Sequence, residues 1–453
     1  MVTVPAEEAR PSQDHIHGRQ AVLLIHGIGE QWPMATLWGL IDGLYQEEMK
    51  QGSLFSKPDR IGKVLDLRRV HVEKEAFGIK TDFYEMYWAH LLQGTTWTHV
   101  QDFVWMLIWR RRSSTPRRLS KIRCIVLAAM IVALLVWGGI YLAATTKVIP
   151  EIPGLLALVP VLLAFVWMFL KLFCQKWGLG YLGDAARYLR PSPENIAVRQ
   201  QIRNAGIDVL QRLHSDGPAR GYDRIVVIGH SLGSVIAYDI LTYLWQKRTA
   251  ETQTTPPTNK TYLHQPCLLK MESLLSSTSD LKEKLSGFQD LQYRLCHEEQ
   301  SHGRSWKITD LITLGSPLTY ADYLMADSKD ELSKRIDRRE FPSCPPTLEK
   351  GGYIAWPDPP CDKLRTLHHA ALFACTRWTN MYFKRDLIGG ELAPLFGCGI
   401  NDIGLDGESD KGKTVKSHLM YWSESEPESC KKLKDAMCLD NRPSRESKSP
   451  SLG

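Results

Sequence analysis

The sequence predicts an α/β fold from three observations. An apolar run typical of a buried strand, Ala21–Ile25, precedes a segment of helical periodicity, Met34–Glu48. A second strand candidate, Arg224–Ile228, runs through a tight turn into a helix candidate, Val235–Trp245. At 453 residues and 43% hydrophobic content, the chain is long enough for one such domain of about two to three hundred residues with additional segments.

The turn between the second strand and its helix is Gly229-His230-Ser231-Leu232-Gly233, a G-x-S-x-G pentapeptide. A serine hydroxyl needs a base and an exposed position to act as a nucleophile, and such a turn exposes it. The glycines let strand and helix pass closely, and the first N–H groups of the helix favour a developing oxyanion. The alternative is a glycine-rich loop in which Ser231 caps an ordinary helix. A second serine, Ser316 in a G-S-P turn, lacks the glycine frame and is expected to have a turn or cap role.

With these residues the chain resembles the α/β-hydrolase superfamily, and within it the lipases and esterases that carry G-H-S-L-G. The resemblance covers about residues 18–100 and 180–422. It implies an α/β-hydrolase fold, in which helices flank a mostly parallel sheet, and a catalytic triad in the order serine, acid, histidine. It also implies an oxyanion hole made by the backbone N–H groups of Ile28 and Leu232, with His26 holding the first of these two loops.

Asp386 and His418 complete the predicted triad in that order. Asp386 lies three residues past the predicted strand Ala371–Phe383, where an acid can reach a histidine on the next loop. His418 is the single histidine downstream of Asp386. We therefore assign Ser231 as the nucleophile, His418 as the general base and then acid, and Asp386 as the group that orients the imidazole.

Other acids and histidines remain as alternatives. Asp322 is a second candidate acid, with His368 or His369 as its base. These histidines precede a predicted strand, however, and active sites of parallel sheets lie at the carboxyl ends of strands. Asp402 and Asp406 are weaker candidate acids in a glycine-rich loop that is otherwise a plain turn.

Residues 97–178 form a predicted membrane insertion. A tryptophan-rich segment, 97–110, is expected to lie at the membrane interface, and a basic stretch without acids follows it. Two apolar runs at about 124–146 and 152–170 are then long enough to cross a hydrocarbon core as helices. Either run alone is also compatible with a buried core helix, but the adjacent pair beside a basic block favours a transmembrane hairpin.

The orientation of this hairpin follows from its charges. The basic stretch precedes the first span, and four more basic residues lie between 171 and 190. The connecting loop holds only Lys147 against Glu151. The positive-inside rule therefore places both flanks, and with them the hydrolase domain, on the cytoplasmic side.

The rest of the chain is divided by composition. A flexible N-terminus without a signal peptide is expected at 1–17, and a disordered tail at 423–453. The hydrolase domain is expected in two parts, 18–96 and 179–422. The second part contains a polar surface insertion at about 246–303, which is expected to be partly helical at Leu281–Leu295 and is a candidate lid. Asp82 and Glu85, three residues apart on a predicted strand, point to opposite faces and are expected to be structural or solvated.

Composition and motifs limit the classes of function. The net charge of +6 implies no general attraction to nucleic acid, and ten scattered cysteines are expected to be free thiols. No metal-binding or phosphate-binding motif occurs, so no cofactor is predicted. The predicted function is a membrane-anchored serine hydrolase that cleaves a lipid or other acyl ester. The alternatives are an acyltransferase or thioesterase of the same fold, or a non-catalytic membrane scaffold; a channel is disfavoured because neither span contains a charge.

Overall fold

A computed structural model describes most of the chain outside the predicted membrane insertion. The described residues are 19–27, 32–45, 54–58, 61, 68–72, 80–91, scattered positions between 120 and 142, 188, 193–215, 221–254, 265–277, 281–304, 306–358, 364–407 and 417–437. The expected flexible N-terminus, 1–17, lies outside them.

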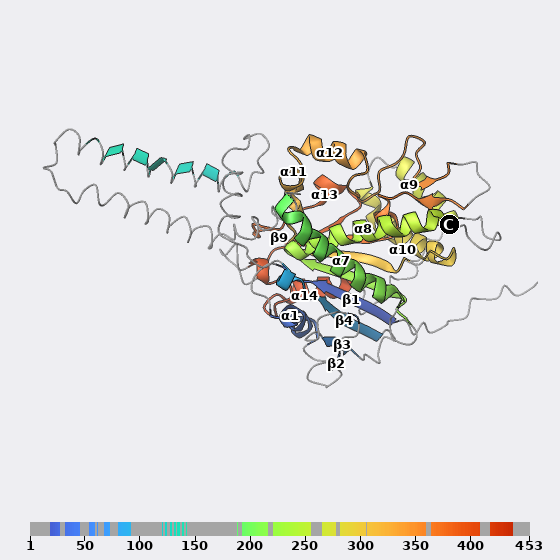
Figure 1. Cartoon of the computed structure of the whole chain (residues 1–453), viewed down its shortest axis with the longest axis horizontal. Coiled ribbons are helices and arrows are strands. Elements are labelled where there is room, and N and C mark those ends of the chain that lie inside the picture. Colours follow the sequence, from blue (N-terminus) through green and yellow to red (C-terminus); the bar gives the residue numbers. More distant parts are fainter. Residues whose placement is uncertain are drawn as a thin grey trace, which may run out of the picture.

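An eight-stranded sheet in the order β10-β9-β6-β5-β1-β4-β3-β2 forms the centre of the fold (Figure 1). The six strands from β10 to β4 are parallel, and β3 and β2 add an antiparallel edge. The strands are β1 (Arg19–Ile25), β2 (Leu54–Pro58), β3 (Arg68–Val72), β4 (Lys80–Met86), β5 (Arg224–His230), β6 (Ile308–Leu314), β9 (Arg377–Phe383) and β10 (Asn401–Leu405). A separate antiparallel pair consists of β7 (Ala355–Trp356) and β8 (Thr366–Leu367).

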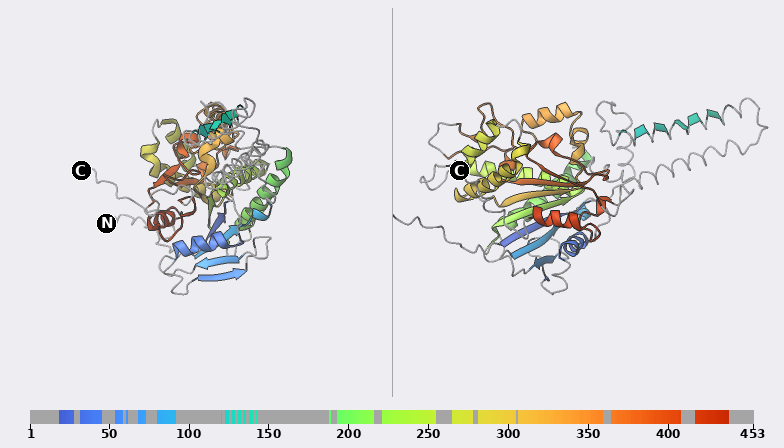
Figure 2. Two further views of the ribbon diagram at one scale, coloured as in Figure 1. Left: turned by 90° about the vertical axis from the view of Figure 1, so that its left-hand side faces the viewer. Right: turned by 180° about the vertical axis from the view of Figure 1, so that it is seen from behind.

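Helices cover both faces of the sheet, so the predicted α/β fold with a mostly parallel, helix-flanked sheet is confirmed. Alternate strand residues pack to opposite sides: Leu23 joins the core under α7, α8 and α10, whereas Val22 joins the core under α1 and α14. Figure 2 shows α1 and α14 together on the face opposite α7 and α8. The helices are α1 (Ala35–Leu44), α7 (Pro193–Ser215), α8 (Leu232–Thr254), α9 (Pro266–Ser277), α10 (Leu285–Ser301), α11 (Ala321–Leu324), α12 (Lys329–Asp337), α13 (Ala393–Phe396) and α14 (Pro427–Ala436).

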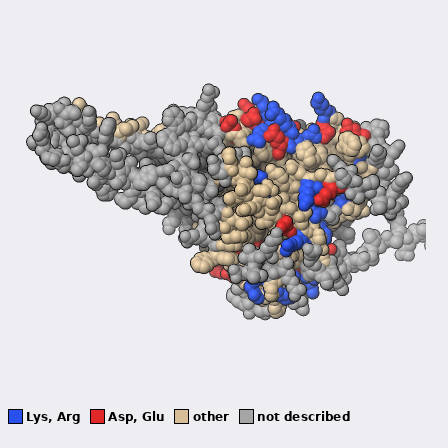
Figure 3. Space-filling model, in the orientation of Figure 1, with Lys and Arg blue, Asp and Glu red and all other residues tan. Residues whose placement is uncertain are grey.

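Short 3-10 turns and the charged helix α12 complete the described structure. The turns are η1 (Ala89–Leu91), η3 (Lys282–Lys284), η4 (Pro317–Tyr320), η5 (Leu372–Ala374) and η6 (Ser417–Leu419). Charged side chains of both signs gather over α12 on the face drawn in Figure 3, whereas the middle of that face is largely uncharged.

The register of the parallel strands brings their carboxyl ends to one edge of the sheet. Ile25 at the end of β1 pairs with Met86 of β4 and with Gly229 of β5. His230 then pairs with Leu314 at the end of β6. The loops that leave these ends therefore meet at a single edge, which is where ligands bind in open α/β sheets.

The expected insertion at 246–303 is helical over most of its described residues, as expected at Leu281–Leu295, but it is not confined to the surface. The helix α8 continues to Thr254, and α10 buries Phe288 and Leu295 in the core beneath the sheet. The seven-residue spacing of these two side chains places both on one face of a helix. The average composition of the segment does not show this apolar face.

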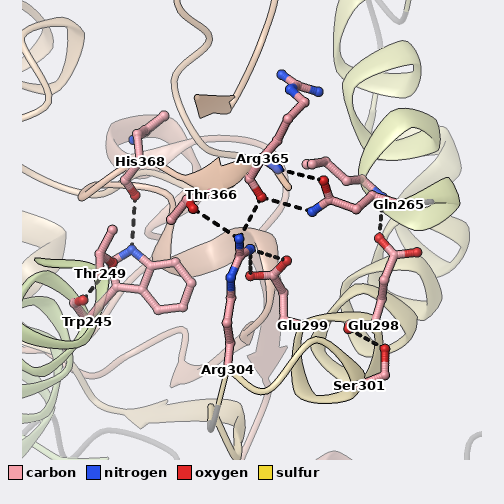
Figure 4. A network of polar contacts seen from close by, with 11 residues as sticks. Trp245, Thr249, Gln265, Glu298, Glu299, Ser301, Arg304, Arg365, Thr366 and His368 are labelled. Atoms are coloured by element: carbon pink, nitrogen blue, oxygen red, sulfur yellow. Dashed lines mark hydrogen bonds and ion pairs between the residues drawn. The ribbon is translucent and has the colours of Figure 1, made fainter. Parts of the chain in front are cut away.

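Buried polar contacts also attach this region to the rest of the fold (Figure 4). The Nη1 of Arg304, just after α10, donates to both carboxylate oxygens of Glu299, and its Nη2 donates to the carbonyl of Arg365 beside β8. Gln265, just before α9, also donates to the Arg365 carbonyl, at 2.9 Å. The described part of this region is therefore joined by polar contacts to the segment around β8.

The expected disordered tail is likewise wrong over 423–437. Residues 427–436 form α14, in which Cys430, Leu433 and Met437 are buried. Their spacing of three and four residues makes one apolar stripe, which packs on the core shared with α1. Residues 438–453 lie outside the described residues.

The predicted membrane insertion, 97–178, lies almost entirely outside the described residues. Scattered described positions between 120 and 142 are helical and lie apart from the sheet in Figure 1. They include the exposed apolar side chains of Ile131, Val132, Leu134 and Leu135. Within the described parts of the chain, no helix is both long enough and apolar enough to cross a membrane. The interfacial helix and the two spans therefore stay predictions.

Asp82 and Glu85 are both buried and have separate structural partners. Asp82 accepts hydrogen bonds from His71 and Tyr222 and pairs with Arg69. Burial raises the pKa of Asp82, but these partners outweigh it and leave the pKa below its ordinary value. Glu85 accepts the N–H of Met34 at the start of α1, and burial raises its pKa to about 7. The expectation of a structural role is confirmed for both.

Stability is expected to fall steeply as the pH drops from 6.5 toward 4. Burial lowers the pKa of four histidines, to about 4 for His26 and His368 and to about 3 for His214 and His230. As the pH falls below 6.5, these histidines become protonated in the unfolded chain before they do so in the folded protein. Each histidine therefore contributes its whole stabilisation above pH 6.5, and below that pH the free energy of unfolding falls by about 1.4 kcal/mol per pH unit for each. The raised pKa of Glu85 has the opposite effect on the free energy of unfolding and offsets the contribution of one histidine.

Urea unfolding at pH 8, 7, 6 and 5 measures this loss. Glu85→Gln removes the opposing group and is expected to steepen the decline between pH 7 and 5. A midpoint that stays constant over that range contradicts the neutral, buried state of the histidines.

Candidate active site

Ser231 occupies the tight turn between β5 and α8 in a strained conformation. Its φ of 53° lies in the left-handed region, which is rare for a residue with a side chain and typical of functional sites. Its N–H donates to the carbonyl of Leu314 at the end of β6 (2.9 Å). A Cβ on Gly229 would lie 2.4 Å from the Ser234 Cα, and one on Gly233 would lie 2.1 Å from the Ile25 carbonyl oxygen. The turn therefore requires glycine at both positions for steric reasons, as the sequence predicts.

The Ser231 hydroxyl is buried without a hydrogen-bond partner among the described residues. The residue is 1% exposed, and its Oγ contacts no donor or acceptor within hydrogen-bonding distance in that part of the chain. Nearly all buried polar atoms in proteins are paired, and those that are not are frequently catalytic. Within the described residues, a buried and unpaired hydroxyl at a strained turn fits the predicted nucleophile.

Asp386 and His418 lie against each other, as the predicted triad requires. The Asp386 Oδ2 is 2.8 Å from the His418 Nδ1, and both residues are buried. A ring nitrogen that faces a carboxylate carries the proton, so Nδ1 is the donor and Nε2 is left to act as a base. Asp386 also accepts hydrogen bonds from the Tyr421 hydroxyl and the Ile388 N–H, each at 2.8 Å.

These contacts keep Asp386 ionised. Burial raises the pKa of its carboxyl, but the charge of His418 and the hydrogen bonds from His418, Ile388 and Tyr421 outweigh burial. The pKa of Asp386 therefore lies below its ordinary value, and the carboxylate is charged at neutral pH. A charged, fully bonded acid is suited to orienting the imidazole and stabilising it when it becomes protonated.

The end of β6 lies against both the predicted nucleophile and the predicted base. Gly315 has a φ of 57°, and a Cβ there would lie 2.9 Å from the Nδ1 and Cε1 atoms of His418. Ser231 bonds to Leu314, the preceding residue. The structure thus places Ser231 and His418 against neighbouring residues at the end of β6, Leu314 and Gly315, although it shows no hydrogen bond from the serine Oγ. In unliganded enzymes this bond is often long and tightens only when substrate binds.

The loop after β1 also contacts Ser231. A Cβ on Gly27 would lie 2.9 Å from the Ser231 Cβ. His26 anchors this loop: its Nδ1 donates to the Gly27 carbonyl (2.8 Å), and its Nε2 accepts the Trp88 N–H (3.2 Å). The structural role expected for His26 is confirmed. Leu232 is the first residue of α8, so its N–H belongs to the helix N-terminus beside the serine. Ile28 lies outside the described residues.

The alternative site residues have structural partners elsewhere. His368 bonds to the Thr347 carbonyl and the Ala370 N–H, and His369 to the Arg339 carbonyl. Asp402 accepts the N–H groups of Leu392 and Ala393 beside α13, and Asp406 pairs with Lys384 at an exposed position. The Ser316 Oγ accepts the Leu318 N–H and caps η4, which confirms its expected cap role. Asp322 lies in α11.

Two features of the site were not predicted. Tyr421 has no signal beyond its position three residues after His418, and its bond to Asp386 depends on the tertiary fold. The predicted strand 371–383 begins only at Arg377, because 372–374 form the turn η5. The described residues contain no group of three or more histidine, cysteine or acidic side chains arranged to hold a metal ion.

No protein-family model matches the chain, and neither does any curated protein or any solved structure. The basis for a functional proposal is therefore the geometry of the site itself. That geometry combines a strained serine at a strand-to-helix turn with an imidazole oriented by a buried carboxylate.

Proposed function

We propose that this chain is a membrane-anchored serine hydrolase of the α/β-hydrolase type that cleaves carboxylic esters. The observation that carries the proposal is the position of Ser231. It lies at a strained turn and bonds to Leu314, and the next residue, Gly315, lies against His418 of the Asp386–His418 pair. A nucleophile, a base and an orienting acid in this arrangement support acyl transfer.

The reaction proceeds in two steps through an acyl-enzyme. The Ser231 Oγ attacks the ester carbonyl carbon while its proton passes to the His418 Nε2, and the N–H groups of Leu232 and Ile28 hold the oxyanion. His418 then gives the proton to the leaving alcohol. A water molecule, deprotonated by His418, attacks the acyl-enzyme and releases the carboxylic acid and the free serine.

The place where the insertion leaves the fold supports a lipid or acyl-chain ester as substrate. The chain departs after β4 and η1 and returns through Tyr188 into α7, and Tyr188 bonds to Asp239 of α8 (2.9 Å). Trp88, just before η1, stacks on His26 of the loop beside Ser231. A transmembrane hairpin attached at this point holds the active site close to the bilayer surface. The charge pattern of its flanks places the domain on the cytoplasmic side.

Labelling with a fluorophosphonate probe in detergent micelles tests the proposal. The native protein is expected to be labelled, and Ser231→Ala and His418→Ala are expected to lose labelling because the first removes the nucleophile and the second its base. Ser316→Ala is the matched control, since it removes the second candidate serine and leaves the proposed triad complete.

Labelling that persists in Ser231→Ala contradicts the assigned nucleophile. A folded native protein that is not labelled favours the non-catalytic scaffold. Product analysis in the presence of an alcohol or a thioester substrate then separates hydrolase from acyltransferase and thioesterase activity.

A further inference from the structure

His230 contacts the loop that carries the proposed base. Its Nε2 lies 2.9 Å from the backbone carbonyl oxygen of His418. The two imidazole rings are 5.1 Å apart, and the indole of Trp422 packs edge-on against His230 at 4.9 Å. Since a carbonyl oxygen can only accept, the Nε2 of His230 carries the proton and donates this bond.

This bond joins the nucleophile and the base by a very short path. His230 precedes Ser231 in the chain, so its side chain connects the nucleophile turn directly to the backbone of His418. Asp386 holds the imidazole of His418 from the other side. The base is thus fixed at two points, through its ring by the acid and through its carbonyl by the turn.

We propose that His230 is a positioning residue, which sets the separation of Ser231 and His418 by donating its Nε2–H to the His418 carbonyl. The inference rests on the proposed function and adds a fourth side chain to its site. Catalysis needs the reacting groups within a few tenths of an ångström of the productive geometry, so loss of this bond affects the rate more than substrate binding.

The buried position of His230 suits this role. The residue is 5% exposed, and burial, followed by the proximity of His418, lowers its pKa to about 3. It is therefore neutral at physiological pH. A neutral ring 5.1 Å from His418 does not oppose the positive charge that His418 acquires during the reaction, as a cationic side chain there would.

A set of three variants separates positioning from packing. His230→Gln places an amide nitrogen the same number of bonds from Cβ as the Nε2, His230→Asn is one bond shorter, and His230→Phe keeps a ring without a donor. The rate of fluorophosphonate labelling of Ser231, and kcat and KM with a p-nitrophenyl ester, are measured together with thermal unfolding.

His230→Gln is expected to stay within about fivefold of the native kcat, whereas His230→Asn and His230→Phe fall about 100-fold with KM changed by less than about threefold. The low-field proton resonance of the His418–Asp386 bond is expected to stay sharp in His230→Gln and to broaden in His230→Asn. If His230→Phe fails to fold, the comparison of Gln with Asn decides.

Equal losses in the Gln and Asn variants, or full rates in Asn and Phe, overturn the inference. A native protein that is labelled normally while its His230 variants behave in either of these ways refutes the positioning role alone. A native protein that is not labelled refutes the proposed function.

Discussion

Asp386→Asn is expected to lower kcat for ester hydrolysis by about 10⁴-fold without unfolding the protein. The carboxylate now accepts from the His418 Nδ1, the Tyr421 hydroxyl and the Ile388 N–H. An amide nitrogen in place of one oxygen donates where it should accept. When it faces His418, the imidazole proton moves to Nε2, and the nitrogen that should take the serine proton is already occupied.

Asp402→Asn is the matched control for this prediction. Asp402 is the alternative acid, but it accepts N–H groups at the start of α13 and a bond from Asn380. Its variant is expected to lower the thermal midpoint while kcat stays within about threefold. Steady-state kinetics on both purified variants settles the assignment: a larger loss of kcat in Asp402→Asn than in Asp386→Asn means that the acid has been misassigned.

Gly233→Ala is expected to cost about 3 kcal/mol or more of unfolding free energy. The added methyl group would lie 2.1 Å from the Ile25 carbonyl oxygen and 2.4 Å from that of His26. These are backbone atoms of the central strand and of the loop after it, so no side-chain rotation relieves the clash. The start of α8 must shift away from β1, which also displaces the turn that carries Ser231.

Gly287→Ala in α10 provides the comparison, because a Cβ at that position has no neighbour within 4 Å. It is expected to raise stability by about 0.5–1 kcal/mol, as alanine restricts the unfolded chain. Urea unfolding of both variants measures the difference. Equal stability of Gly233→Ala and the native protein would falsify the close packing of helix and strand at the turn.

The sequence predicts best those parts of the site whose geometry is local. The turn around Ser231 requires glycines at fixed offsets, so the pentapeptide specifies both the backbone strain and the approach of α8 to β5. The pairing of Asp386 with His418 was also predicted from the sequence, because each residue lies next to an apolar segment near the end of the domain. The two residues are far apart in the chain, but only one histidine follows Asp386, so chain order identified the base.

Contacts that depend on tertiary packing were not predictable in this way. The polarity of the segments that form α10 and α14 hid a narrow apolar stripe in each, such as Phe288 with Leu295 and Cys430 with Leu433. A helix with one buried stripe and a charged remainder is polar on average, so composition alone suggests surface or disorder. Tyr421 and the side chain of His230 reach the site only because loops from distant strands meet at one edge.

The two strands at the middle of the sheet have a consequence for synthesis on the ribosome. The N–H of Arg19, at the start of β1, bonds to Asp223, 204 residues later in the chain. At about 5–20 residues per second, β1 waits roughly 10–40 s for β5 after it has been made. During this time the apolar residues of β1 lack the neighbouring strand β5, and residues 92–187 are synthesised before β5. The nascent chain is therefore expected to depend on a chaperone that holds β1 until β5 has been made.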